Sequence, residues 1–257
     1  MQKFNDNDKN FYDFEYFFST ADWRIFSRAH GGRYGFLLPY LKLHISGMKI
    51  LDVGCGSGFL TNYLATLGNI VTGTDNSEAA ITISRDRYPS LEFIRCSAYD
   101  LPEKLLCGEF DLVTGFDLIE HLHHQADFLE LARQCLRPGG KLLLTTDNMS
   151  CVGARNWFWK KILNLGMFLS RDGLEYKMIK RMEKNKFRHL NRRGYSKSHV
   201  GLLQPGGLKN LLESSRFKVI DFKFYSLYRV WPYDLLVKLV SKEKRYESML
   251  FLAESVG

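Results

Sequence analysis

Five short apolar runs alternate with stretches of helical pattern between residues 48 and 147, and this alternation limits the fold more than any other feature. The apolar runs span 48–53, 70–75, 91–96, 110–115 and 141–146, and the helical pattern covers 58–67, 77–87 and 118–136. A helix and a strand within 205–225 and a last strand at 249–253 follow later in the chain. Strands that are apolar along their whole length and alternate with helices are typical of a parallel sheet covered on both faces. The sequence therefore predicts an α/β fold.

The composition is that of a globular protein. The chain has 257 residues, of which 45% are hydrophobic and 25% charged, and this excludes wholesale disorder. No apolar stretch reaches the roughly 18–20 residues of a membrane span, and the N-terminus lacks the pattern of a secretory signal. The five cysteines form no CxxC pair, so we expect neither a disulfide framework nor a cysteine zinc site. We expect a cytoplasmic protein that is soluble or associated with a membrane surface.

The chain divides into three parts by composition. Residues 1–46 are rich in aromatic side chains and mostly helical in pattern, and we interpret them as an N-terminal helical lid. Residues 151–198 interrupt the alternation with 13 lysines and arginines against three acidic residues, a net charge of +10, whereas the whole chain carries +8. We interpret this stretch as a basic aromatic insert that caps the substrate. Residues 47–150 and 199–257 then form the sheet domain.

A glycine-rich loop follows the first apolar run, in the sequence LDVGCGSGFLT. Its glycines lie at positions 54, 56 and 58, where the absence of β-carbons lets a ligand approach backbone N–H groups at the start of the next helix. The GxGxxG pattern of dinucleotide sites fails, because Phe59 or Thr61 stands where the third glycine belongs, and the triphosphate loop is absent. The pattern that fits is Asp-x-Gly-x-Gly-x-Gly. By itself it is also compatible with a structural glycine turn in another α/β protein.

Two further carboxylates follow the second and third runs. Asp75 ends the second run, where a carboxylate can accept both ribose hydroxyl protons, and Ser77 can cap the following helix in its place. Asp100 precedes Pro102 after the third run and is equally explained as an ordinary turn residue.

Together with LRPGGKLLLTT at 136–146, these motifs resemble class I S-adenosylmethionine (SAM) methyltransferases of methyltransferase type 11. The resemblance implies a Rossmann-like, mostly parallel sheet of seven strands flanked by helices, with the last strand antiparallel and a helical cap. It also implies SAM as cofactor. The cofactor-binding residues that it indicates in these motifs are Asp52, Gly54, Gly56, Gly58, Asp75, Asn76 and Asp100.

An Asp-x-x-Glu-His motif follows the fourth run. If a helix begins near Asp117, then Asp117, Glu120 and His121 share one of its faces. That face would start at the carboxyl ends of the central strands, where open α/β sheets bind their ligands. Two carboxylates and an imidazole in such a place suit a divalent cation.

At this motif the chain resembles the ubiquinone-biosynthesis O-methyltransferases and, more distantly, the small-RNA 2′-O-methyltransferases. The resemblance implies Asp117, Glu120, His121 and the downstream His199 as ligands of a divalent metal (Mg, Mn or Zn), although these families usually carry Glu where this chain has Asp117. Two alternatives stay open: His121 as a metal-free general base with Glu120 beside it, or a structural Glu–His pair at a helix start.

Two more residues follow from the resemblance to the quinone enzymes. Arg33, 21 residues before Gly54, matches an arginine on the SAM carboxylate, for which a guanidinium is suited. A solvated helix arginine explains it as well. Phe116 matches a residue whose backbone lines the methionine end of the cofactor, and it also suits a core aromatic position.

The sequence of the insert does not identify what it binds. Residues 156–169 combine two tryptophans and two phenylalanines with Lys160 and Lys161, which suits either a helix at a membrane surface or a cap over a substrate pocket. The chain carries no signature of an RNA-binding module, so we do not expect nucleic acid as partner. The sequence does not indicate an oligomeric state.

We therefore predict O-methylation of a small-molecule acceptor, such as a phenol, a quinol precursor or a sugar-like intermediate. The competing hypotheses are an RNA 2′-O-methyltransferase, which the metal set and the basic insert would suit, and a SAM-binding scaffold without catalysis.

Overall fold

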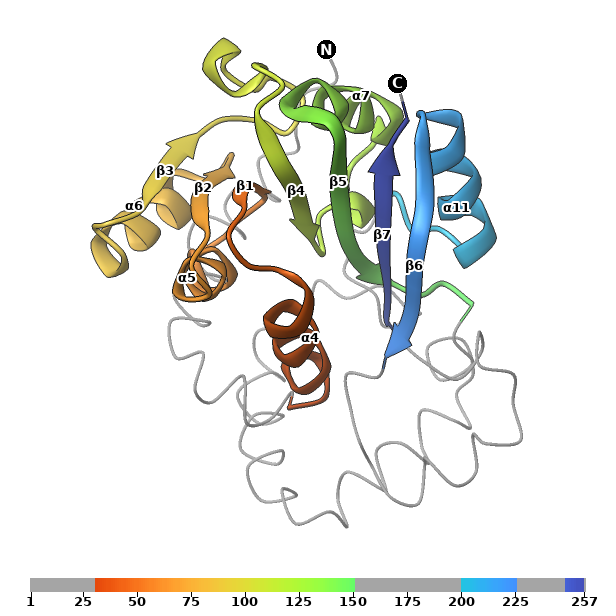
Figure 1. The fold of residues 1–257 in the computed structure, drawn as a ribbon, viewed down its shortest axis with the longest axis horizontal. Coiled ribbons are helices and arrows are strands. Elements are labelled where there is room, and N and C mark those ends of the chain that lie inside the picture. Colours follow the sequence, from red (N-terminus) through yellow and green to blue (C-terminus); the bar gives the residue numbers. More distant parts are fainter. Residues whose placement is uncertain (1–30, 151–199, 226–247, 257) are drawn as a thin grey trace.

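The computed structural model describes residues 31–150, 200–225 and 248–256, and these build one seven-stranded sheet with helices on both faces (Figure 1). The order across the sheet is β3-β2-β1-β4-β5-β7-β6. The strands are β1 (Lys49–Val53), β2 (Ile70–Asp75), β3 (Glu92–Arg95), β4 (Phe110–Phe116), β5 (Leu136–Asp147), β6 (Phe217–Tyr225) and β7 (Ser248–Ser255). All seven overlap the apolar runs that the sequence predicts as strands.

The sheet is parallel from β3 to β5 and antiparallel at the far side. Neighbours among β3, β2, β1, β4 and β5 pair in parallel, and the last strand, β7, lies between β5 and β6 and is antiparallel to both. The predicted architecture is thereby confirmed. The central strands are buried along nearly their whole length, because helices cover both of their faces.

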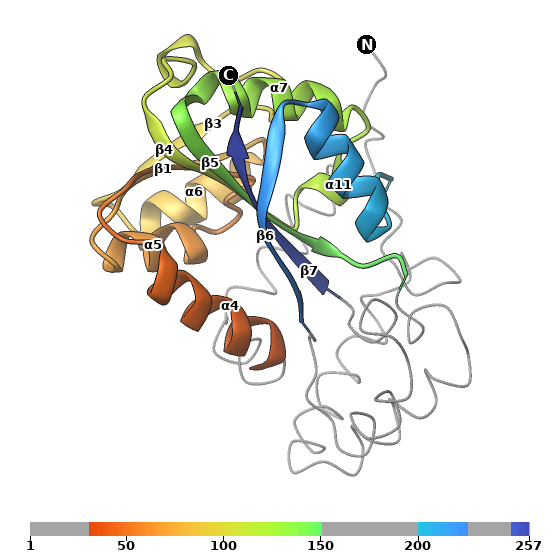
Figure 2. The ribbon, with the colours of Figure 1, turned by 45° about the vertical axis from the view of Figure 1, so that its right-hand side comes forward.

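Helices pack on the two faces of the sheet (Figure 2). Helices α4 (Gly31–His44), α5 (Phe59–Thr66) and α6 (Glu78–Arg87) lie on one side, and α7 (Gln125–Cys135) and α11 (Pro205–Ser214) lie on the other. Each side has its own apolar core. Leu37 and Leu41 of α4 pack with Leu64 of α5 in one core, and Phe128 of α7 packs with Leu208 of α11 in the other.

The helix predicted over 118–136 is two elements, and that prediction was wrong over residues 118–124. A short 3-10 helix, η3 (Ile119–His121), is followed by a break and then by α7. Asp117 has φ 52°, in the left-handed region, and Leu122 is extended, so no α-helix can run through these positions. The second short 3-10 helix, η2 (Glu103–Leu105), lies in the connection between β3 and β4.

The predicted lid and insert lie largely outside the described residues. Of residues 1–46, the structure describes 31–46, which include α4, and Leu37 and Leu41 of this helix are buried in an apolar core. The insert at 151–198 and its aromatic segment 156–169 are outside the described residues. Within the described part of the chain, none of the helices has the length and apolar character needed to cross a membrane.

Candidate functional site

The site lies where the chain reverses its direction of travel across the sheet. From β1 the chain moves outward to β2 and β3, and it then returns to place β4 on the other side of β1. Ligands of open α/β sheets bind at the carboxyl ends of strands beside such a reversal. The glycine loop follows β1, and the Asp-x-x-Glu-His motif follows β4. The two motifs therefore leave neighbouring strands at the same edge of the sheet.

The glycine loop adopts a conformation that side chains would oppose. Gly54, Gly56 and Gly58 have φ of 74°, 54° and 77°, all in the left-handed region. A β-carbon at Gly54 would lie 2.9 Å from Cδ1 of Leu118, so the loop approaches the segment that carries the Asp-x-x-Glu-His motif closely. Helix α5 begins after Gly58 without a side-chain cap. Backbone N–H groups at a helix start that has no side-chain cap suit a cofactor that carries hydrogen-bond acceptors.

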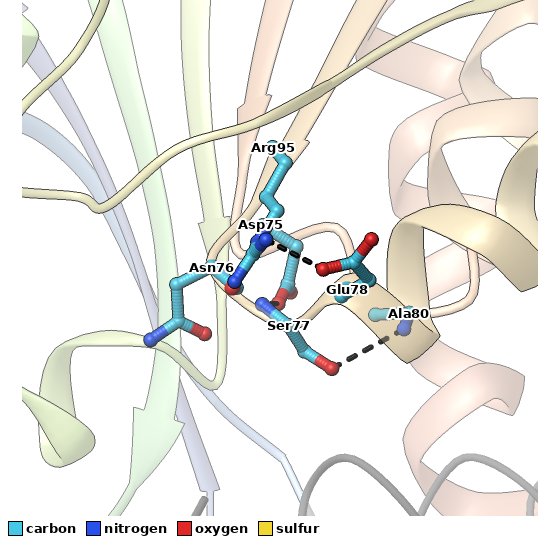
Figure 3. Close-up of polar contacts among 6 residues, drawn as sticks. All are labelled: Asp75, Asn76, Ser77, Glu78, Ala80 and Arg95. Carbon is cyan, nitrogen blue, oxygen red and sulfur yellow. Dashed lines mark hydrogen bonds and ion pairs between the residues drawn. The ribbon is translucent and has the colours of Figure 1, made fainter.

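Asp75 ties the tip of β2 to the glycine loop. Its Oδ2 atom accepts a hydrogen bond from the Gly56 N–H at 2.9 Å, and its Oδ1 atom accepts one from the Ser77 N–H at 2.9 Å. The Ser77 hydroxyl caps α6 by accepting from the Ala80 N–H, as the sequence predicts (Figure 3). Each carboxylate oxygen has two lone pairs, so Asp75 can accept further hydrogen bonds from a ligand's hydroxyls.

The residues that follow Asp75 face different ways (Figure 3). The exposed Asn76 points its side chain away from the start of α6. Glu78 instead forms an ion pair with Arg95 of β3, at 2.6 Å, and both side chains are exposed. The Asn76 side chain is thus exposed at the end of β2, and the Glu78–Arg95 pair is a surface feature.

Asp52 is buried behind the loop rather than exposed to a ligand. Its two oxygens accept hydrogen bonds from the hydroxyls of Thr61, at 2.6 Å, and Thr114, at 2.8 Å. Burial is the main cause that raises the pKa of Asp52 to about 6, and the two hydroxyls oppose this shift. Because Thr61 lies on α5 and Thr114 on β4, Asp52 joins the three elements that frame the loop.

Asp100 lies in the turn after β3, as the sequence predicts, and Phe116 is the last residue of β4, one residue beyond the predicted run. The exposed Asp100 follows β3 in a turn in which its N–H donates to the Ser97 carbonyl. Phe116 packs, partly buried, against the core beneath α4. Arg33 belongs to α4, but its side chain is not among those described.

Two adjacent threonines at the end of β5 hold the Asp-x-x-Glu-His turn. The Thr145 hydroxyl accepts from the Asp117 N–H at 3.1 Å and donates to Asp117 Oδ1 at 3.2 Å. The Thr146 hydroxyl donates to Oε2 of Glu120 at 2.8 Å. Our sequence reasoning missed both threonines. The signal available was two polar residues in succession at the end of the otherwise apolar run LLLTT.

Glu120 and His121 lie in different surroundings. The Glu120 side chain is buried, and burial raises the pKa of its carboxyl well above the usual range, helped by the negative charges of Asp117 and Asp147. His121 is half-buried and therefore accessible to a ligand. His121 is thus the more accessible of these two side chains, and the buried Glu120 carboxyl is bound to Thr146.

The predicted metal ligands do not form a metal site within the described residues. No group of three His, Cys, Asp or Glu side chains in 31–150, 200–225 and 248–256 is arranged to hold a metal ion. The fourth predicted ligand, His199, lies outside these residues. The turn explains the difference, because Asp117 and Glu120 are each bound to a different threonine and do not share a helical face.

Comparisons with known proteins agree with this geometry. Residues 51–144 match the family model described as a methyltransferase domain. Ubiquinone biosynthesis O-methyltransferase from Nitrosococcus oceani is 36% identical over 117 residues, 43% of this chain and 49% of that protein. The protein of that name from Aromatoleum aromaticum is 33% identical over 108 residues, 40% of this chain and 46% of that one. The chain thus spans about half the length of these curated relatives.

Solved structures share the fold at low sequence identity. A SAM-dependent methyltransferase from Mesorhizobium loti has a TM-score of 0.57 at 17% identity, covering 88% of this chain and 99% of that one. A SAM-dependent methyltransferase from Aquifex aeolicus has a TM-score of 0.58 at 14% identity, covering 99% of this chain and 100% of that one.

Proposed function

We propose that this chain transfers the methyl group of SAM to a hydroxyl oxygen of a small-molecule acceptor, because residues 51–144 match the methyltransferase-domain model. The observation that carries this proposal is the Gly56–Asp75 hydrogen bond. It joins a glycine loop open to a cofactor with a carboxylate that can bind ribose hydroxyls, next to a turn that presents a half-buried imidazole. The names of the curated relatives favour oxygen as the methylated atom.

The residues of this chain fit SAM at the carboxyl ends of β1 and β2. The glycines at 54, 56 and 58 give the loop the positive φ values that a side chain would oppose, and Asp75 offers lone pairs to the ribose hydroxyls. Asn76 and Asp100 are exposed at the same edge of the sheet and suit contacts to the adenosine end. When bound, SAM supplies an electrophilic methyl group on a positively charged sulfur.

We assign proton removal to His121. Histidine is the commonest general base in enzymes, and a neutral imidazole can accept the proton of the acceptor hydroxyl. The oxygen then attacks the methyl carbon and the carbon–sulfur bond breaks, so no covalent intermediate forms on the protein. Since the described residues do not assemble a metal site, no step here runs through a metal.

Calorimetry and a methyl-transfer assay test the proposal. We would measure SAM binding first, and then transfer of labelled methyl groups to a panel of a catechol, a phenol, a sugar and a short RNA. We expect SAM binding, transfer to one of the hydroxyl acceptors, and a large loss of kcat in His121→Ala with SAM affinity retained. The matched control is His123→Ala, because His123 is an exposed histidine two residues further along the chain. This variant should keep its activity.

The outcomes separate the hypotheses. No SAM binding would overturn the proposal altogether, and SAM binding without transfer to any acceptor would favour a scaffold. Activity that survives in His121→Ala would remove His121 as the base. Metal analysis of the purified protein belongs to the same experiment: a stoichiometric divalent ion that is lost in His121→Ala would replace the base mechanism by a metal-assisted one.

A further inference from the structure

Gln125 is the first residue of α7, and its side-chain amide connects this helix to the backbone of η3 and to the backbone at Gly201. Its Nε2 atom donates to the Ile119 carbonyl at 2.7 Å and to the Gly201 carbonyl at 2.6 Å. The Gly201 N–H in turn donates to the Glu120 carbonyl at 2.9 Å. These bonds bind the carbonyls of two successive residues of η3, and they reach a segment 76 residues further along the chain. We call this set of bonds the Gln125 bridge.

The turn η3 depends on such outside partners because it is short. Within the turn, the His121 N–H donates to the Leu118 carbonyl at 2.9 Å, and the Leu122 N–H reaches the Ile119 carbonyl only at 3.3 Å. Short 3-10 helices have poor hydrogen-bond geometry and leave carbonyls in need of other donors. The Gln125 bridge supplies those donors for Ile119 and Glu120, the two residues directly before His121.

The contact at Gly201 is too close for any other residue. A β-carbon there would lie 2.4 Å from Nε2 of Gln125 and 2.6 Å from the Leu122 carbonyl oxygen. The absence of a side chain at position 201 therefore allows the Gln125 bridge to close.

The Gln125 bridge is not needed to hold α7 on the sheet. Phe128, Leu129, Ala132 and Cys135 of this helix are fully buried in the apolar core and fix its position by packing. The amide instead acts locally on η3, at the carboxyl ends of the central strands. On its other side η3 is held by Thr146 through Glu120.

We propose that Gln125 is a positioning residue, which fixes η3 and thereby the direction in which His121 presents its imidazole to the acceptor. The inference rests on the proposed function. Catalysis of this kind is sensitive to placement, since a displacement of about 1 Å can cost on the order of 100-fold in rate. Loss of the Gln125 bridge should therefore lower kcat. It should not affect the glycine loop, which is held by Asp75.

The test uses Gln125→Met, which keeps the length of the side chain and removes both donors. The matched control is Asn69→Leu. Asn69 also bridges two backbone groups, because it accepts from the Met48 N–H and donates to the Leu64 carbonyl, but it lies before β2 at the opposite edge of the sheet. In both variants, backbone groups lose the side chain to which they are hydrogen-bonded, so we expect both proteins to be less stable to unfolding.

Two readouts decide the proposal. Amide hydrogen exchange at His121 and Gly201 should become about ten-fold faster in Gln125→Met and stay unchanged in Asn69→Leu. With an acceptor from the panel, kcat should fall on the order of ten- to 100-fold in Gln125→Met, while the Kd for SAM stays within about two-fold of the original protein. In Asn69→Leu, kcat should be retained.

Unchanged exchange at His121 and Gly201 would overturn the proposal, whether or not an acceptor is found. Faster exchange with an unchanged kcat would also overturn it, because the Gln125 bridge would then be purely structural. If the original protein methylates nothing in the panel, the proposed function fails, and hydrogen exchange alone decides whether Gln125 fixes the turn.

Discussion

The Gly56 N–H donates to Oδ2 of Asp75 across 2.9 Å, so the carboxylate that ends β2 also fixes the loop that follows β1. The same carboxylate accepts the Ser77 N–H and thereby shapes the entry into α6. Asp75 therefore fixes the backbone of the glycine loop through hydrogen bonds within the protein. A site arranged in advance loses less conformational entropy when it binds.

Replacing Asp75 by Asn should weaken SAM binding by about ten-fold or more, because the charged acceptor is lost and the new amide N–H₂ opposes a backbone donor. Isothermal titration of SAM into Asp75→Asn measures the effect. Glu78→Gln is the control, since Glu78 is an exposed carboxylate three residues away whose ion pair with Arg95 contributes little. Equal losses of affinity in both variants would contradict a specific role of Asp75.

The buried Asp52 should make the protein less stable as the pH rises from about 4 to about 6. Its pKa is about 6 in the folded chain against an ordinary 3.8, so the folded state holds a proton in this range that the unfolded state has lost. The destabilisation should be on the order of 2–3 kcal/mol once the pH exceeds 6. Urea unfolding of the original protein and of Asp52→Asn at pH 4 and pH 7 checks this. We expect the variant to gain stability relative to the original protein between the two pH values, and a constant difference would refute the pKa assignment.

Gly54→Ala should abolish SAM binding and destabilise the fold, because the loop needs a positive φ and the new methyl group would meet Leu118. Gly68→Ala is a matched control, since Gly68 also has a positive φ, of 82°, but has free space around the position of a β-carbon. Both variants should lose about 1–2 kcal/mol from backbone strain. Calorimetry should then show lost SAM binding in Gly54→Ala only.

Thr145→Val removes the hydroxyl that bonds the N–H and the carboxylate of Asp117, and it leaves the bond from the Asp117 N–H to the Thr145 carbonyl. We expect a loss of about 1 kcal/mol in stability and a fall in kcat on the order of ten-fold, with SAM affinity retained. Thr72→Val is the matched control, because Thr72 is also a buried strand residue with a hydroxyl–carboxylate bond, to Glu92. If Thr72→Val and Thr145→Val lower kcat equally, Thr145 has no specific part in the site.

Local patterns sufficed to predict much of the fold. The strand over 70–75 was predicted with the bounds of β2, and the cap at Ser77 was predicted because a serine at a helix start favours one hydrogen-bond arrangement. A glycine turn after the first strand was likewise predicted from the sequence, and its three positive φ values are ones that glycine adopts readily. These features depend on neighbours in sequence, and such neighbours are visible in the chain itself.

The prediction of a helix from Asp117 onward was wrong because this turn depends on a residue that is distant in sequence. Asp117 is held by Thr145, 28 residues away, and this contact stops the helical path before it begins. Helical spacing then no longer applies, and Asp117, Glu120 and His121 do not share the face on which the predicted metal site depended.

The sequence by itself determined the alternation of strands and helices, the glycine loop and the carboxylate at the tip of β2, because these follow from periodicity and from the backbone preferences of single residues. Tertiary structure alone decided how the Asp-x-x-Glu-His turn is held. Strand register brings Thr145 and Thr146 to Asp117 and Glu120, and the return of the chain at Gly201 closes the Gln125 bridge. Hydrogen bonds between residues far apart in sequence form only where the packed core brings their elements together, and no local pattern encodes that placement.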